Sequence, residues 1–152
     1  MKQEDKELLL KDLSARLPFG VKCRDLVTKT DITVKGINAL YSDDNPMIIS
    51  IEGNADTYLV NIRPYLRPMN SITDEELEEL HNLVCPNNAD SSFDVDGYFT
   101  SKTDCNGHLM SYTFMVTVMD FLLRHNFDFR GLIEKGLALE EIKIKDKDNG
   151  IV

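Results

Sequence analysis

The chain has 152 residues, of which 42% are hydrophobic and 28% are charged, as is ordinary for a folded protein. Its formal net charge of −9 argues against direct binding to nucleic acid, because contact with phosphates needs a surplus of Lys and Arg. No run approaches the roughly 18–20 apolar residues that span a membrane, and three cysteines fit a reducing compartment better than a disulfide framework. Because the N-terminus also lacks the apolar region of a signal peptide, we expect a cytoplasmic protein without a membrane segment.

An amphipathic helix is predicted within residues 1–17, beginning near Glu4. Leu9, Leu13 and Leu17 recur at every fourth residue and form its apolar stripe. The opposite, polar face is predicted to carry Lys6, Glu7, Lys11, Asp12 and Arg16. A proline and a glycine shortly after the last leucine end the helix, and we expect it to pack on its own domain.

Residues 18–69 are predicted to form a small antiparallel β-unit. The hydrophobic pattern changes here to a period of two, and clusters of Asp, Asn and Gly separate short runs of β-branched and aromatic residues. These runs are residues 21–23, 32–37, 47–51 and 57–62. Because the connections are too short for crossover helices, neighbouring strands should be antiparallel. An SH3-like barrel or a curled sheet is the expected closure.

Residues 70–152 are predicted to be mainly helical, and they carry the whole charge imbalance. Residues 1–69 hold ten basic and ten acidic side chains, whereas the second part has a net charge of −9. Thr73 and Glu76 form a capping box, in which each side chain satisfies the free backbone N–H of the other residue. A helix should therefore begin there. The strongly apolar residues 108–125 predict a second, central helix.

The segment of residues 126–140 is predicted to seal the core, with residues 137–139 extended. Its apolar side chains are Phe127, Phe129, Leu132, Ile133, Leu137 and Leu139. Each contributes about 1.5–3 kcal/mol when fully buried. The fold class predicted from the whole chain is therefore α+β: an N-terminal helix, a small β-unit and a C-terminal helical part, joined as one compact unit.

Two pairs of histidine and cysteine residues are the best candidates for a metal site. His81 and Cys85 are one helical turn apart, and Cys105 and His108 lie at the start of the next predicted helix. Four such ligands could close a tetrahedral zinc site. Their spacing is not that of zinc knuckles, however, and any chain with three cysteines and three histidines yields similar pairs. We therefore predict no metal and no other cofactor.

The connector between the β-unit and the first acidic helix places Arg63, Tyr65 and Arg67 at alternate positions in an extended, proline-bracketed segment. Such a surface would suit a peptide, an acidic partner or a single-stranded nucleic acid. The other interpretation is intramolecular, with both arginines neutralising the acidic helix at residues 74–79 or the carboxylates of the following loop. We favour the internal role, and retain the three residues as candidates for partner binding.

Nothing in the sequence marks an enzyme active site. There is no Gly-rich phosphate loop, no dinucleotide fingerprint and no glycine-flanked nucleophile. Cys85 or Cys105 beside a histidine could act as a nucleophile, because an imidazole can lower the pKa of a thiol. The many paired carboxylates fall at positions predicted to be exposed, where their pKa values are not expected to be tuned. A binding protein is therefore favoured over an enzyme.

Three segments carry a resemblance to known sequences. They are Leu-Pro-Phe-Gly-Val at residues 17–21, residues 62–76 beginning Ile-Arg-Pro-Tyr-Leu-Arg-Pro, and residues 126–140 beginning Asn-Phe-Asp-Phe-Arg-Gly. In order and spacing they resemble a group of short uncharacterised proteins encoded on phages, prophages and mobile elements of gut anaerobic bacteria. The resemblance covers most of the chain outside residues 85–107. It implies a cytoplasmic bacterial or phage accessory protein, and it implies no activity, cofactor or catalytic residue.

The sequence thus predicts a non-enzymatic protein-interaction module of phage or mobile-element origin, with a protein partner of unknown identity. One alternative is an acidic decoy or inhibitor of a host nucleic-acid-binding protein, which requires carboxylates regularly arrayed on one surface. The other is a small metal- or thiol-dependent enzyme, which requires the histidines and cysteines to converge in a cleft.

Overall fold

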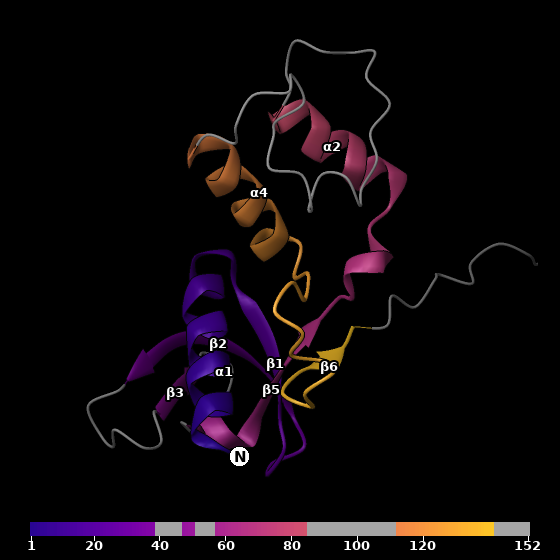
Figure 1. Ribbon diagram of the computed structural model, residues 1–152. Helices are drawn as coiled ribbons and strands as arrows, with labels where there is room; N and C mark the ends of the chain where they lie inside the picture. The colour runs from indigo at the N-terminus through magenta and orange to yellow at the C-terminus, as the bar shows by residue number, and fades with distance from the viewer. Residues whose placement is uncertain (39–46, 51–56, 85–111, 142–152) are drawn as a thin grey trace, which may run out of the picture.

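The computed structural model describes residues 1–38, 47–50, 57–84 and 112–141, and the fold is given for these residues (Figure 1). The helices are α1 (Gln3–Arg16), α2 (Asp74–Val84) and α4 (Tyr112–Arg124). The strands are β1 (Val21–Asp25), β2 (Asp31–Asn38), β3 (Met47–Ser50), β4 (Thr57–Tyr58), β5 (Ile62–Leu66) and β6 (Leu139–Glu140). Short 3-10 turns lie at Leu17–Phe19, Leu59–Asn61 and Met69–Ser71. The predicted α+β class is confirmed.

The six strands form one mixed sheet with the order β4-β3-β2-β1-β5-β6. Neighbours from β4 to β5 are antiparallel, as predicted, whereas β6 pairs in parallel with β5, with Tyr65 opposite Leu139. The antiparallel pairing predicted for residues 18–69 is thus confirmed for the described strands. At this edge β6 adds a parallel strand from far along the chain, and its pairing with β5 was not predicted. Among the described strands β4 and β6 are the two edges and do not pair with each other. The sheet is thus open there, and closure into an SH3-like barrel is not confirmed.

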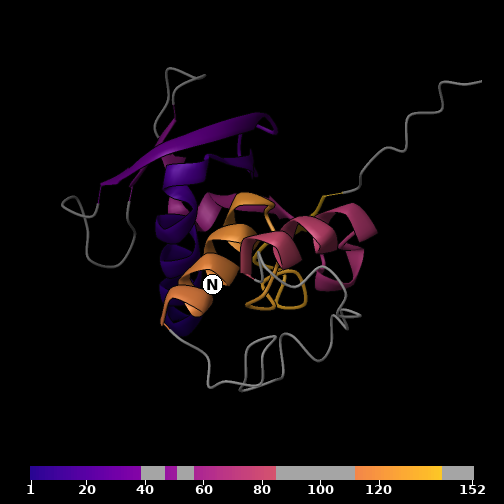
Figure 2. The ribbon, with the colours of Figure 1, turned by 90° about the horizontal axis from the view of Figure 1, so that it is seen from above.

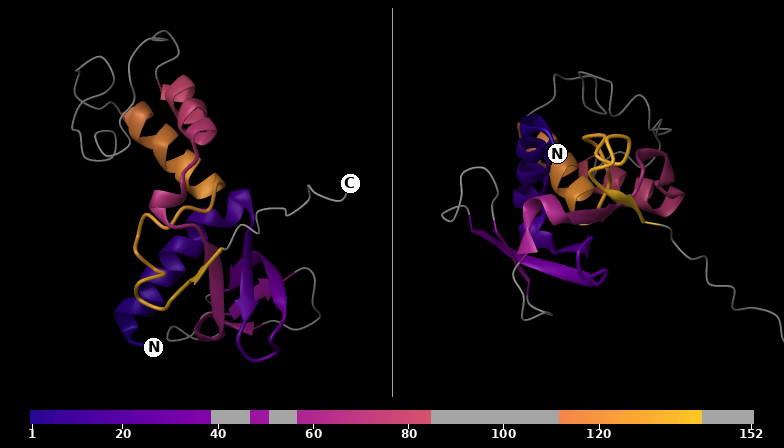
Figure 3. Two further views of the ribbon diagram at one scale, coloured as in Figure 1. Left: turned by 90° about the vertical axis from the view of Figure 1, so that its right-hand side faces the viewer. Right: turned by 90° about the horizontal axis from the view of Figure 1, so that it is seen from below.

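Helix α1 covers one face of the sheet (Figures 1 and 3). Its Leu9 and Leu13 are fully buried, which confirms the predicted apolar stripe. The strand residues that complete this first core are Val21, Cys23, Ile32, Val34, Ile48, Ile62 and Leu66. They alternate along each strand with residues that face the other way, as the two-residue period of a β-strand requires. No described helix covers that other face (Figure 2).

A second apolar cluster joins α2 to α4 at the far end of the molecule from β3 (Figure 1). Its buried members are Leu80, Phe121, Leu122 and Phe127. On its outer side α4 leaves Met115 and Val116 exposed by 52% and 57%. The prediction of a fully central helix was therefore wrong on that side. Among the described helices, none has the length and apolar character needed to cross a bilayer.

The segment after α4 connects the two clusters. The side chains that it gives to the cores are Phe127, Leu132, Leu137 and Ala138. Its backbone also runs beside Arg67, whose N–H donates to the carbonyl of Asn126 (2.8 Å) and whose carbonyl accepts from the N–H of Asp128 (2.7 Å). The prediction that residues 126–140 seal the core is confirmed for Phe127, Leu132 and Leu137. Phe129 and Ile133 are partly buried, and Leu139 remains 36% exposed.

Candidate functional site

Strand β5 places Arg63 and Tyr65, two of the three candidate partner-binding residues, on the face of the sheet that lies away from α1. The alternation along the strand buries Ile62, Pro64 and Leu66 and leaves Arg63 and Tyr65 half-exposed. Their common orientation follows directly from their spacing of two residues in an extended strand.

The guanidinium of Arg63 is held by backbone carbonyls. Its Nε donates to the carbonyl oxygen of Gly136 at 2.8 Å, and its Nη1 donates to those of Val60 and Ile62 at 3.1 and 2.7 Å. Partial burial lowers the pKa of Arg63, but a guanidinium remains protonated in proteins. No acidic residue in the described part of the chain pairs with it, so Arg63 is a fixed side chain with an unneutralised charge.

Tyr65 is fixed by a carboxylate that it shares with an arginine. The Tyr65 hydroxyl donates to Oδ1 of Asp31 at 2.7 Å, and Nη1 of Arg24 donates to the same oxygen at 2.9 Å. The hydrogen bond from Tyr65, together with that from Arg24, lowers the pKa of the Asp31 carboxyl. The same contact with Asp31 raises the pKa values of Tyr65 and Arg24. Asp31 thus neutralises Arg24 and orients Tyr65.

Arg67 does not share the surface of Arg63 and Tyr65. It follows the end of β5, its side chain is 5% exposed, and its Nη1 and Nη2 donate to the two carboxylate oxygens of Glu76 at 2.6 and 2.8 Å. Nη2 also donates to the carbonyl oxygen of Ser71 at 2.9 Å, and the guanidinium lies 4.3 Å from the centre of the Phe127 ring. For Arg67, these contacts agree with the internal role that was favoured from the sequence.

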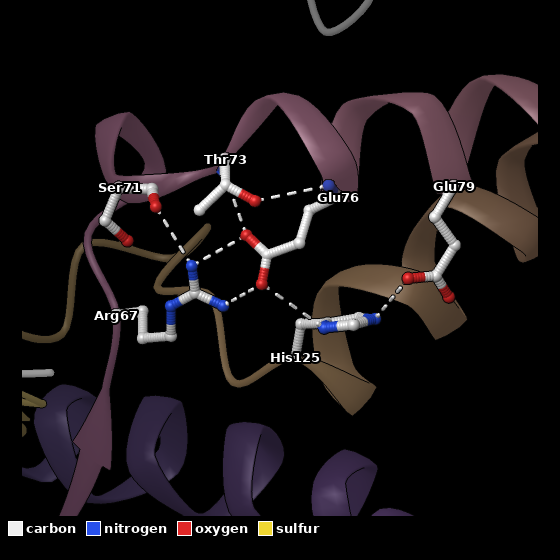
Figure 4. Close-up of polar contacts among 6 residues, drawn as sticks. All are labelled: Arg67, Ser71, Thr73, Glu76, Glu79 and His125. Atoms are coloured by element: carbon white, nitrogen blue, oxygen red, sulfur yellow. Dashed lines mark hydrogen bonds and ion pairs between the residues drawn. The ribbon is translucent and has the colours of Figure 1, made fainter. Parts of the chain in front are cut away.

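Arg67 belongs to a polar joint between β5, α2 and α4, defined here as Arg67, Thr73, Glu76, Glu79 and His125 (Figure 4). The N–H of Thr73 donates to Oε2 of Glu76 (3.0 Å), and the N–H of Glu76 donates to Oγ1 of Thr73 (3.3 Å), which confirms the capping box. His125 lies between the two glutamates, with Nδ1 at 3.6 Å from Oε1 of Glu76 and Nε2 at 3.4 Å from Oε2 of Glu79. No local pattern predicts the position of His125, because its partners are far away along the chain.

A second internal charge cluster lies on the buried side of α1. Asp12 and Arg16 are fully buried and paired, with 2.7 Å between Oδ2 of Asp12 and Nε of Arg16. Arg16 also donates to the carbonyl oxygen of Phe127 (2.8 Å), and Nε of Arg130 lies 3.4 Å from Oδ1 of Asp12. The prediction that Asp12 and Arg16 lie on the polar face of the helix was therefore wrong. Their opposite charges, four residues apart beside Leu13, were the available signal for a pair.

The face of the sheet opposite α1, called the open face below, is basic although the protein is acidic. Its outward residues are Lys22 and Arg24 on β1, Asp31, Thr33 and Lys35 on β2, and Arg63 and Tyr65 on β5. Lys22 and Lys35 are exposed and form no hydrogen bond or ion pair within the described residues. Asp31 pairs with Arg24, and the charge of Lys22 also helps to lower the pKa of Asp31. Three cations on this face form no ion pair within the described residues and are called unneutralised below: Lys22, Lys35 and Arg63.

A hollow of about 430 Å³ opens at one end of the open face. Its lining includes Phe19, Lys22, Thr33, Tyr65, Asn126 and Glu141. Aromatic, basic and amide groups, together with the carboxylates of Asp31 and Glu141, thus border the open face where the sheet meets the segment after α4. The open face is therefore concave at this end.

The candidate metal ligands cannot be assembled from the described residues. His81 lies half-buried on α2, whereas Cys85, Cys105 and His108 lie outside the described residues. Within the described ranges, no group of three His, Cys, Asp or Glu side chains is arranged to hold a metal ion. Cys23, which was not a candidate, lies in the first core, where burial raises the pKa of its thiol to about 12.

No protein-family model, curated protein or solved structure matches the chain. The resemblance to accessory proteins of phages and mobile elements therefore stays a prediction. What the protein does is inferred from its own surfaces.

Proposed function

We propose that this protein is a non-enzymatic interaction module, an accessory protein of a phage or mobile element that binds a protein partner in the bacterial cytoplasm. The open face is its contact surface. The observation that carries the proposal is the presence of three unneutralised cations, Lys22, Lys35 and Arg63, on a sheet face that no described helix covers. In a chain of net charge −9, such a face is a local exception and favours a partner of opposite charge.

Two residues of the open face are already held in place before any partner binds. Arg63 is fixed by three carbonyl groups, and the Tyr65 ring is fixed by the bond of its hydroxyl to Asp31. Preorganised side chains lose less conformational entropy on association, and Tyr and Arg are the residue types that most often dominate binding energy at interfaces. These features support a contact surface with two fixed anchors and two exposed lysines beside them.

The enzyme alternative has less support. The one described cysteine, Cys23, is buried with a thiol pKa of about 12, whereas a nucleophilic thiol is partly exposed and has a lowered pKa. His125 is engaged with Glu76 and Glu79, and its Nε2 is buried. These groups hold elements together and are poorly placed to reach a substrate.

The acidic decoy remains the second candidate because of α2. Four carboxylates on this helix, Asp74, Glu75, Glu78 and Glu79, are exposed, although Glu79 also lies beside His125. They form two adjacent pairs one turn apart, which is a short array compared with the many phosphates that a nucleic-acid-binding protein contacts. The open face therefore supports the interaction module better than α2 supports the decoy.

The proposal is tested by reversing charge on the open face and asking whether partner capture is lost. The test variant is Lys22→Glu/Lys35→Glu, and the matched control is Lys2→Glu/Lys11→Glu. All four lysines are exposed, and both double variants change the net charge equally. The control lysines lie at the start of α1 and on its exposed side, away from the open face.

Each tagged protein is expressed in host cells, cross-linked and purified, and the captured proteins are quantified, with circular dichroism as the check on folding. We expect the test variant to lose a partner that the control variant keeps. A wild-type protein that captures nothing above background would contradict the interaction module. If both variants retain the partner equally, the contact does not lie on the open face. If both lose it equally, capture depends on net charge alone.

A further inference from the structure

The three unneutralised cations of the open face lie on an oblique line across three adjacent strands. Arg63 on β5 pairs with Arg24 on β1. Lys22 precedes Arg24 by two residues and pairs with Thr33 on β2, and Lys35 lies two residues further along β2. Each step from Arg63 to Lys22 and from Lys22 to Lys35 therefore moves one strand sideways and two residues along, in the same direction.

The last of these cations lies at an irregularity in β2. Asp31, Thr33 and Lys35 share the open face because side chains alternate along a strand, and Lys35 is exposed whereas Val34 is fully buried. The register with β3 shifts between Val34 and Gly36, so that Lys35 is the additional residue of a β-bulge. Bulges are common beside functional sites. The line of cations therefore extends beyond Thr33 and ends at the bulge.

The spacing of this line matches an extended peptide. Strands are about 4.8 Å apart and alternate residues about 7 Å apart, so successive cations have Cα atoms about 8 Å apart. In an extended peptide, side chains on the same side repeat about every 7 Å, and the flexible stems of lysines cover the difference. We infer that the open face binds an extended acidic segment of a partner protein, with a carboxylate at every second residue, obliquely across β5, β1 and β2. This inference rests on the proposed function.

Asp31 favours a peptide over a nucleic acid as the occupant. Its Oδ1 accepts the bonds from Tyr65 and Arg24, while its Oδ2 makes no bond within the described residues. A peptide that alternates acidic and uncharged residues can place an uncharged residue beside Asp31, where a backbone N–H can donate to Oδ2. Every nucleotide of a nucleic acid carries a phosphate, which Asp31 would repel. Three unneutralised cations would also give a nucleic acid only a few phosphate contacts, against the field of the remaining negative charge.

The inference is tested with defined probes and the full-length protein. The first probe is a fluorescent, end-blocked peptide in which Glu and Thr alternate. The second has the same composition with all Glu residues in one block, the third replaces Glu with Gln, and the fourth is an oligothymidylate. Fluorescence anisotropy at physiological ionic strength measures binding of each probe to the wild type, to Lys22→Glu/Lys35→Glu and to the control Lys2→Glu/Lys11→Glu.

We expect the alternating peptide to bind the wild type and the control variant equally, and the test variant at least about tenfold more weakly, which corresponds to about 1.4 kcal/mol. The block peptide should bind several-fold more weakly than the alternating one, and the Gln peptide should not bind. Equal binding of the block and alternating peptides would overturn the matched spacing. Tighter, Lys22- and Lys35-dependent binding of the oligothymidylate would reassign the face to nucleic acid.

The same variants separate a failure of this inference from a failure of the proposed function. If no acidic peptide binds although the captured cellular partner still depends on Lys22 and Lys35, the inference is wrong and the interaction module stands. If the captured partner is indifferent to both lysines, the proposed function itself is wrong.

Discussion

At the scale of single residues, Arg67 shows how a buried cation is stabilised. Its guanidinium lies between the Glu76 carboxylate and the Phe127 ring, and it also donates to the Ser71 carbonyl. A buried ion pair contributes little compared with a well-packed apolar pair, but removal of one partner leaves an uncompensated charge. The cost of replacing Arg67 therefore depends mainly on the fate of Glu76.

We expect Arg67→Met to lower the free energy of unfolding by about 3 kcal/mol, because Glu76 loses both charge-assisted bonds in a mostly buried position. Thr73→Ala, which removes only one half of the capping box, should cost about 1 kcal/mol. Urea denaturation monitored by circular dichroism measures both. A loss from Arg67→Met no larger than that from Thr73→Ala would mean that the ion pair contributes nothing beyond the helix cap.

The shared carboxylate on the open face makes a prediction about pH. The bonds from Tyr65 and Arg24 lower the pKa of Asp31 in the folded protein, so we expect its carboxyl to titrate below the ordinary value of about 3.9 in NMR spectra. Because the folded-state pKa is the lower one, the contribution of Asp31 to stability is present above the unfolded-state pKa. It is lost as the pH falls through the lowered native value.

Tyr65→Phe should move the pKa of Asp31 back towards the ordinary value, because the largest cause of the shift is then removed. An NMR titration of Asp31 in this variant that matched the wild type would assign the shift to Arg24 alone.

Burial makes Cys23 unreactive. Since its thiol has a pKa of about 12, almost no thiolate exists near neutral pH, and the side chain is also inaccessible. In a Cys85→Ser/Cys105→Ser background, iodoacetamide at mildly alkaline pH should label Cys23 only after unfolding, as followed by mass spectrometry. Labelling of the folded protein at the rate of the denatured one would show that the first core opens readily.

At the scale of elements, the segment after α4 determines how the sheet and the helical part meet. Asp128 initiates its turn by accepting from the N–H groups of Leu132 and Ile133, both at 2.8 Å. Gly136 has a φ of 68°, a conformation that costs little only for glycine. This turn carries Leu132 into the first core and brings the chain back to pair with β5.

We expect Leu132→Ala to lower the free energy of unfolding by about 2–5 kcal/mol, the range for a fully buried leucine that leaves a cavity. Leu139→Ala is the matched control in the same segment, because Leu139 is 36% exposed whereas Leu132 is 0% exposed. It should change stability by no more than about 0.5 kcal/mol. Similar losses in chemical denaturation of the two variants would contradict the placement of this segment in the core.

The elements that sequence reasoning predicted well are those that local chemistry determines. The capping box of Thr73 and Glu76 spans three residues and formed as expected, and so did the leucine stripe of α1. The parallel strand β6 depends on pairing between residues far apart in the chain, for which a single sequence gives no signal. The alternation of Arg63, Tyr65 and Arg67 predicted one shared surface, but the chain leaves the sheet after Leu66, so Arg67 joins the helices instead.

At the scale of the whole molecule, the two apolar clusters share one segment and should unfold together. Phe127 belongs to the second cluster, and Leu132 and Leu137 belong to the first. Buried charges reinforce the connection, because Arg16 of α1 donates to the Phe127 carbonyl. A boundary between the β-unit and the helical part therefore does not separate two independent cores.

We accordingly predict a single cooperative transition. In urea denaturation followed by NMR, the native resonances of the sheet and of α4 should disappear with the same midpoint, as expected for a two-state domain of this size. In Leu132→Ala, the two midpoints should move to lower urea concentration by the same amount. Loss of the α4 resonances at a lower denaturant concentration than those of the sheet would instead define the helical part as a separate unit.

The parallel pairing of β6 with β5 also means that β5 is synthesised well before the strand that pairs with it. Strand β5 is complete once residue 66 has emerged from the ribosome, but the strand that pairs with the outer edge of its Tyr65 and Leu66 ends only at residue 140. Until then, the N–H and C=O groups of that edge have no neighbouring strand and can pair with another nascent chain. Translation rate and chaperone access over residues 67–140 should therefore influence how much protein reaches the folded state, even in variants with unchanged stability.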